Sequence, residues 1–266
     1  MDLSSLGPDV EWPDSEAGTA VRERLADIPD LGHLAPLAEW WYSVRPRESL
    51  ERVRGLVVGS MPPAVVTQAA DAVGASVRVV GDDEDGVAVA DDEIDGGADL
   101  LIVAVPGSGA DAAIAVSVLT NTEPVKVLAR GAAATDPDAW MERAVAVRDA
   151  RRRCLPLRED PDRLLAGIGS ARLAAAAGIV LRAAARRTPV LLDGPVAAAA
   201  ALVAYEVQPR AVRWWAAADL GPDPLHEIAL TRLGQGAILG LGTGFGDGLA
   251  GLLAVPVIRA AATFGG

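Results

Sequence analysis

A glycine-rich loop near the end of the chain has the residue types needed to approach a ligand closely. Gly242–Gly248 (GTGFGDG) places four glycines and Asp247 directly before a predicted helix. Backbone N–H groups of Gly244, Gly246 and Gly248 could approach an anion, with Asp247 beside the ligand. The pattern fits equally well a flexible turn in which Asp247 is the helix N-cap. The loop is not a dinucleotide-binding fingerprint, because no βαβ unit follows it.

A second loop, VPGSGAD at 105–111, also precedes a predicted helix. Backbone amides of a turn at a helix N-terminus can hold a phosphate, and a serine hydroxyl can join them. The candidate phosphate-binding residues are Pro106, Gly107, Ser108 and Gly109. A plain turn is the alternative interpretation. The loop is not a P-loop, since no Gly-Lys-Ser/Thr follows.

Two further loops carry carboxylates where predicted strands end. In LLDG, Asp193 and Gly194 could orient a ligand hydroxyl, although Asp193 as a cap of the next helix is slightly favoured. DLGPDPLH holds Asp219, Asp223 and His226 in a segment with two prolines, whose rigidity keeps side chains in place. A lone histidine is more often structural than catalytic. Both loops are nevertheless candidate substrate-binding segments.

The elements that must position these loops alternate along the chain. Short apolar segments without period-two alternation indicate strands buried on both faces, hence a parallel sheet between helices. Predicted strands cover 55–59, 76–80, 99–105, 189–192, 212–215 and 237–241, and predicted helices cover 20–28, 34–44, 62–73, 111–119, 136–152, 170–186, 196–205, 224–233 and 247–261, with a short helix from 160. Ligands of such sheets bind beyond the carboxyl ends of the strands, where these loops lie.

The predicted fold class is therefore α/β, a mostly parallel sheet sandwiched by helices in a Rossmann-like three-layer arrangement. A small N-terminal helical region is expected at 1–50, and the α/β domain at 51–266. The acidic run 82–85 is expected to be a solvated loop.

Composition excludes several classes of function. A net charge of −12 disfavours nucleic acid and anionic membranes as partners. One cysteine and two histidines argue against a metal site, and they leave little material for a Ser-His-Asp triad. We expect no metal and no cofactor. The N-terminus has no signal-peptide pattern and the apolar runs are short, which favours a cytoplasmic protein.

Several segments, in order, resemble the nicotinate-nucleotide:5,6-dimethylbenzimidazole phosphoribosyltransferase family. They are ADLLI at 98–102, SVLTNTEPVKVLARG at 117–131, PVLLDG at 189–194 and AVPVIRAA at 254–261. Arg213–Trp215 precedes the place of the family's H-x-S-x-E-P-G-H loop. The resemblance runs from about residue 55 to the C-terminus and is strongest from residue 161 onward.

The resemblance implies a reaction and a base. In the family, a glutamate in R-L-G-E-G-T/S-G removes the imidazole proton of dimethylbenzimidazole. The activated nitrogen attacks ribose C1 of nicotinate mononucleotide, expelling nicotinate and giving α-ribazole phosphate for the lower ligand of cobalamin. Spacing without a gap places Asp247 on that glutamate. The resemblance also implies a homodimer.

This chain departs from the family in its ligand loops. H-x-S-x-E-P-G-H becomes DLGPDPLH, G-E-M-G-I-G-N-T-T becomes the shorter VPGSGAD, and an acidic residue of G-G-x-E/D becomes Arg172. The A-x-D-H-G turn after the first strand is absent, and the chain is shorter than usual members. Two hypotheses follow: a working phosphoribosyltransferase, or a non-catalytic homologue that binds a nucleotide or base and could pair with an active relative.

Overall fold

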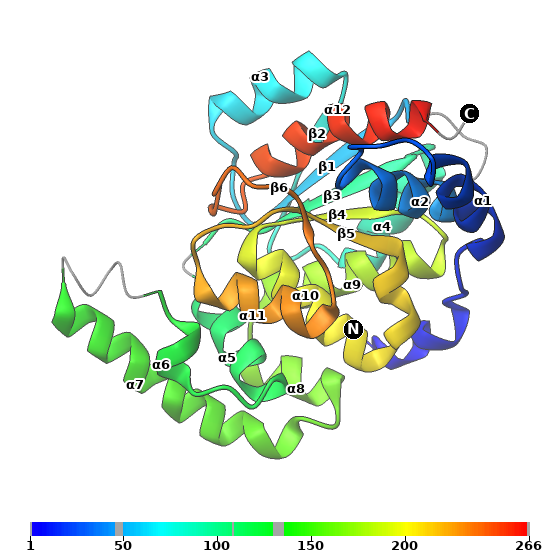
Figure 1. Cartoon of the computed structure of the whole chain (residues 1–266). Coiled ribbons are helices and arrows are strands. Elements are labelled where there is room, and N and C mark those ends of the chain that lie inside the picture. Colours follow the sequence, from blue (N-terminus) through cyan, green and yellow to red (C-terminus); the bar gives the residue numbers. More distant parts are fainter. Residues whose placement is uncertain (1, 46–49, 108, 130–135, 265–266) are drawn as a thin grey trace.

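Parallel strands form the centre of the molecule (Figure 1). The computed structural model describes residues 2–45, 50–107, 109–129 and 136–264, and within them six strands make one sheet in the order β2-β1-β3-β4-β5-β6. The strands are β1 (Val53–Val58), β2 (Ser76–Val80), β3 (Leu100–Ala104), β4 (Val190–Asp193), β5 (Trp215–Asp219) and β6 (Ala237–Leu239). The four inner strands are buried almost throughout, as apolar strands without alternation predict.

Helices cover both faces of this sheet (Figure 1). On one face α2 and α3 pack against α12, and α1 packs on α2; on the other, α4, α9, α10 and α11 form a row, with α5 to α8 beyond α10. The helices are α1 (Ser15–Leu25), α2 (Leu34–Val44), α3 (Ala64–Val73), α4 (Gly86–Asp95), α5 (Ala110–Leu119), α6 (Pro124–Val127), α7 (Pro137–Cys154), α8 (Pro161–Ile168), α9 (Ala171–Ala185), α10 (Gly194–Val207), α11 (Pro224–Leu233) and α12 (Leu249–Thr263). The predicted three-layer α/β class is confirmed.

The order of the strands reverses beside β1. The chain passes from β1 to β2 on one side, and then from β2 to β3, which pairs with the other side of β1. The loops after β1 and β3 therefore leave the sheet in opposite directions. A crevice opens at such a switch point, and parallel α/β proteins bind ligands there.

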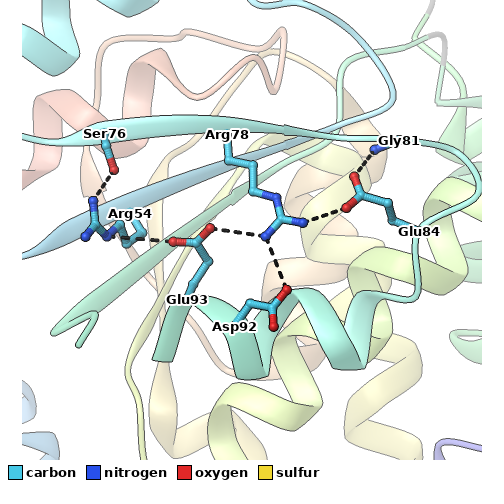
Figure 2. A network of polar contacts seen from close by, with 7 residues as sticks. All are labelled: Arg54, Ser76, Arg78, Gly81, Glu84, Asp92 and Glu93. Atoms are coloured by element: carbon cyan, nitrogen blue, oxygen red, sulfur yellow. Dashed lines mark hydrogen bonds and ion pairs between the residues drawn. The ribbon is translucent and has the colours of Figure 1, made fainter. Parts of the chain in front are cut away.

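Polar side chains join the edge strand β2 to α4 (Figure 2). Arg78 on β2 donates to Glu84 at 2.6 Å and to Glu93 at 3.3 Å. Arg54 on β1 lies 3.7 Å from the same Glu93 and donates to Ser76. These ion pairs fill the space between an edge strand and a helix where apolar packing would be expected.

The acidic run 82–85 is more ordered than the sequence suggested. Asp82 pairs with Arg172 at 2.7 Å, and Glu84 accepts the Gly81 N–H at 2.7 Å. Asp85 is the N-cap of α4 and accepts the Val87 N–H. The prediction of a loop at the surface is confirmed. The correction is that helix α4, which the sequence analysis did not predict, begins directly after the run.

A second correction concerns the strand predicted at 212–215. Pro209–Trp214 is a 3₁₀-helix, and β5 follows it as Trp215–Asp219. Three alanines occupy the middle of β5 because the strand is buried on both faces, where small side chains fit between helices. The strand therefore ends at Asp219, which brings this carboxylate to the edge of the sheet.

The N-terminal residues join the same hydrophobic cluster as the sheet, through Leu3, Val21 and Trp41. Asp162 of α8 accepts the backbone N–H groups of Leu3 and Ser4. The division into residues 1–50 and 51–266 stays a prediction.

Candidate active site

The predicted ligand loops converge at the carboxyl edge of the sheet, through close contacts between glycines. A Cβ placed on Gly194 would lie 2.5 Å from Gly246 Cα, and one on Gly246 would lie 3.3 Å from the Val105 carbonyl oxygen. A Cβ on Gly221 would lie 2.7 Å from Gly244 Cα. Real Cβ atoms essentially never lie within 3.0 Å of another backbone, so glycine is required at 194 and 221, whereas the contact at Gly246 is tight.

Asp247 is half-buried in the last of these loops, just before α12. Its Oδ1 accepts the Leu249 N–H at 3.1 Å. Gly248, with φ of +101°, occupies the N-cap position, so Asp247 is one residue outside the cap and helps to start the helix. A Cβ on Gly248 would meet Val57 and Ala104, which places this turn over β1 and β3, beside the switch point.

Asp193 ends β4 with its side chain turned into the protein. It is 2% exposed, and its Oδ2 accepts the Gly251 N–H of α12 at 2.8 Å. Asp193 occupies the N-cap position of α10, as predicted, but its side chain makes no capping hydrogen bond to that helix. Burial, together with the negative charges of Asp247 and Asp219, raises the pKa of Asp193 to about 7.

Asp219 ends β5 and binds the loop that follows β6. It is 1% exposed; Oδ1 accepts the Leu241 N–H at 2.8 Å, and Oδ2 accepts the Thr243 N–H at 2.7 Å and the Thr243 hydroxyl at 2.6 Å. Burial by itself would raise the pKa of Asp219, but the donors from Thr243 and Leu241 outweigh it and hold the pKa below its usual value.

Asp223 and His226 belong to the turn that begins α11. Asp223 is the N-cap and accepts the Leu225 N–H at 3.0 Å; burial raises its pKa, against the opposing effects of that bond and of Arg143. His226 is 0% exposed, and its Nδ1 accepts the Gly221 N–H at 3.2 Å. Burial lowers the pKa of His226 to about 4, so the ring is neutral.

One cavity, of about 330 Å³, lies beside the VPGSGAD loop. Pro106, Gly107 and Gly109 line it together with the first residues of α5, α9 and α10. Arg172 of α9 supplies a cation to its wall, and its guanidinium holds the pKa of Asp82 below the usual range. Gly59, which ends the β1 segment, leaves room for this side chain, because a Cβ there would lie 2.2 Å from Arg172 Nε.

A larger cavity, of about 780 Å³, lies between the loop 240–248 and α6. Its walls are mainly apolar, with Asp223 and Lys126 as the charged side chains among the described lining residues. Phe245, which is 82% exposed, borders this cavity between two glycines. Its volume is within the range of small-molecule sites.

The structure thus separates the predicted site residues into three groups. Asp247, Gly194, Gly246 and Gly248 lie where the loops pack together and line neither of these two cavities. Pro106, Gly107, Gly109, Asp223 and Gly244 line cavities, whereas Ser108 lies outside the described residues. Asp193, Asp219 and His226 direct their polar atoms into the protein, and a contact with substrate stays a prediction for all predicted residues. The sequence analysis did not predict that Arg172 lines the smaller cavity or that Phe245 lines the larger one. The available signals were the position of Arg172 at the start of a predicted helix and the position of Phe245 between two glycines.

Neither a metal site nor a membrane span is found among the described residues. No group of three or more histidine, cysteine, aspartate or glutamate side chains could hold a metal ion there. No helix in the described part of the chain is long and apolar enough to cross a membrane.

Known proteins resemble this chain in sequence and in fold. A sequence profile described as phosphoribosyltransferase (DBI_PRT) matches residues 83–265. The nicotinate-nucleotide–dimethylbenzimidazole phosphoribosyltransferase of Streptomyces avermitilis is 45% identical over 180 residues, covering 66% of this chain and 48% of that protein. The protein of the same name from Mycobacterium marinum is 35% identical over 323 positions, covering 95% of this chain and 90% of that protein.

A solved structure shows the same fold. CobT from Thermus thermophilus superposes with a TM-score of 0.79 at 22% identity, covering 94% of this chain and 96% of that one. The alignments with the Streptomyces avermitilis protein and with its Mycobacterium ulcerans counterpart span about half of those relatives' length, at 48% and 49%. The alignment with the Mycobacterium marinum protein has 323 positions against 266 residues here, so that relative carries residues this chain lacks.

Fold and loops together define an α/β protein with cavities beside the loops at the carboxyl edge of a parallel sheet. The sequence profile and the Mycobacterium marinum protein both match most of the chain, and these matches identify its family. This chain belongs to the nicotinate-nucleotide–dimethylbenzimidazole phosphoribosyltransferase family.

Proposed function

We propose that this chain transfers phosphoribose from nicotinate mononucleotide to a benzimidazole-type base, giving α-ribazole phosphate for the lower ligand of cobalamin. The observation that carries the proposal is Asp247, a half-buried carboxylate in a glycine loop beside the switch point of the sheet. Family membership supports the reaction class. The proposed substrates are the mononucleotide and the base, with no cofactor.

Asp247 is the proposed general base. Its carboxylate accepts the imidazole N–H proton, and the nitrogen lone pair forms a bond to ribose C1 from the face opposite nicotinate. The bond from C1 to the pyridinium nitrogen breaks, and its electron pair returns to that nitrogen, so nicotinate leaves and the product is the α-anomer. Base catalysis of this kind contributes about 10²–10⁴-fold.

The two cavities divide the substrates between them. The smaller one would hold the phosphate, through the amides of the loop at Gly107 and Gly109 and the N-terminus of α5. The larger, mainly apolar one would hold the base, with Asp223 and Gly244 on its wall. In this arrangement the His226 side chain accepts the Gly221 N–H and holds that turn in place. Gly246 and Gly248 allow the loop that carries Asp247 to pack closely against the neighbouring loops and strands.

The test is an assay with nicotinate mononucleotide and 5,6-dimethylbenzimidazole, in which chromatography measures released nicotinate and α-ribazole phosphate. We expect product from the parent, and a loss of at least about 100-fold in kcat for Asp247→Asn. Asp9→Asn, on an exposed residue of the first 3₁₀-helix, is the matched control and should keep full activity. Equal turnover by Asp247→Asn and the parent would refute the role of Asp247.

The second hypothesis, a non-catalytic homologue, is favoured by the shortened loops and by the residues this chain lacks. It predicts no product, while either substrate still raises the melting temperature. Any turnover would exclude it. A homodimer and a cytoplasmic location also stay proposals; sedimentation velocity tests the first and cell fractionation the second.

A further inference from the structure

We propose that Asp193 and Asp219 are positioning residues that hold the two ends of the loop carrying Asp247. This inference rests on the proposed function, because it concerns the placement of the proposed base. Neither carboxylate would touch substrate; each would act through backbone N–H groups.

Asp219 holds the beginning of the loop. Three donors from Leu241 and Thr243 reach its two oxygens at 2.6 to 2.8 Å. The carboxylate stands at the end of β5, beside Leu239 of β6 in the parallel register, so the anchor is part of the sheet itself. Hydrogen bonds to a buried charged group are stronger than neutral ones.

Asp193 holds the other end, where the loop becomes α12. Its Oδ2 accepts the Gly251 N–H, and the Ala250 N–H also interacts with it. These are amides of the first turn of α12, which lack partners within the helix. Gly251 is pressed onto β3, since a Cβ there would lie 2.2 Å from Ile102 Cγ2. The start of α12 is thus fixed against the sheet from two directions.

Asp247 lies midway between the two anchors, four residues after Thr243 and four before Gly251. Three of the intervening residues are Gly244, Gly246 and Gly248, which have wide backbone freedom. Without anchors, such a segment would sample many conformations and the carboxylate would move with it. The anchors therefore supply the fixed geometry that a catalytic base requires.

The environment of Asp193 is consistent with a structural role for its carboxylate, that of accepting backbone N–H groups. Burial and the charges of Asp247 and Asp219 all act against a negative charge at this position. A carboxylate in such a place is unfavourable unless backbone donors hold it. The sequence keeps an aspartate there although an apolar residue would avoid this cost.

The experiment compares alanine variants of both anchors with Asp14→Ala. Asp14 is the N-cap of α1, where its side chain accepts two backbone N–H groups. Asp14→Ala therefore also removes hydrogen bonds to backbone N–H groups at the start of a helix, but at a place far from the loop that carries Asp247. We expect Asp193→Ala and Asp219→Ala to lower kcat about 30- to 100-fold, with KM for nicotinate mononucleotide within about threefold. Asp14→Ala should leave kcat unchanged. Asn at either position keeps one acceptor and should restore part of kcat, and it serves as the test if an alanine variant fails to fold.

Backbone amide exchange supplies a readout that does not need turnover. Asp219→Ala should accelerate exchange at Leu241 and Thr243, and Asp193→Ala at Ala250 and Gly251, by at least about tenfold, with no change in Asp14→Ala. If the parent shows no transferase activity, the proposed function fails, while exchange still decides whether the anchors exist. Unchanged exchange, or accelerated exchange with kcat within twofold of the parent, would overturn the positioning role.

Discussion

Replacing Gly194 by alanine should disturb the site by displacing the backbone of the loop that carries Asp247. Gly194 has φ of +83°, and an added Cβ would lie 2.5 Å from Gly246 Cα and 2.8 Å from Gly246 N. Carbon atoms in contact are normally about 3.5 Å apart. The loop must therefore move by about 1 Å, and the atoms in its way are backbone rather than a flexible side chain.

The expected cost has two parts. A left-handed backbone costs a residue with a side chain about 1–2 kcal/mol, and overpacking adds about 1–3 kcal/mol. Gly74→Ala is the matched control, because Gly74 has φ of +65° but no atom within 4 Å of the added Cβ. The control isolates the backbone cost, so Gly194→Ala should lose about 1–3 kcal/mol more free energy of unfolding than Gly74→Ala.

Urea denaturation measures both losses, and steady-state assays measure the effect on kcat. A displacement of about 1 Å at a catalytic group costs about 100-fold in rate, so we expect Gly194→Ala to lower kcat by about that factor while Gly74→Ala keeps it. Equal stability losses in the two variants, with unchanged kcat, would refute the conclusion that the β4 turn restrains the loop of Asp247.

Three further predictions concern buried charge. The pKa of His226 is about 4 in the folded protein against 6.5 ordinarily, so the unfolded chain binds a proton at higher pH than the folded protein does. As pH falls from 6.5 to 4, the parent should therefore lose about 3 kcal/mol of folding stability relative to His226→Gln. Urea denaturation at several pH values measures this difference. For Asp193 the pH dependence of stability runs the other way, because its pKa is raised from 3.8 to about 7 in the folded protein. Its contribution to stability is present below pH 3.8 and is lost as pH rises to 7. Over that range the parent should lose about 4 kcal/mol of folding stability relative to Asp193→Asn, which the same urea series measures. Arg78→Met should cost about 1 kcal/mol by removing partners of Glu84 and Glu93, which thermal melts can detect.

The sequence predicts those elements whose ends carry strong local signals. The helix 224–233 begins at a proline and ends before a glycine, and the structure has α11 at Pro224–Leu233. The strand 76–80 agrees with β2, and the helix 34–44 with α2. By contrast, α4 was missed, because the second half of its sequence GVAVADDEID is acidic and the helix directly follows the acidic run 82–85. Its position depends on contacts with α9, which are far away in the chain.

The same limit applies to the site. Parallel-sheet topology placed the loops at one edge, since that follows from the strand pattern. The partner of Asp193 is 58 residues away, at Gly251, and no local pattern indicates it. Likewise, the strand was predicted to end at residue 215, which placed Asp219 in the following loop. Its hydrogen bonds to Leu241 and Thr243 depend on its place at the end of β5 and could not be predicted.

The anchors of the loop 240–248 have a consequence for how this family could diversify. Because Asp193 and Asp219 stand on strands, outside the segment they hold, none of the anchoring hydrogen bonds uses the side chain of Phe245. Phe245 is mostly exposed and lines the larger cavity, so its replacement would alter the wall of that cavity at little cost in stability. Position 245 is therefore a place where mutation can explore new ligands while the chain continues to fold.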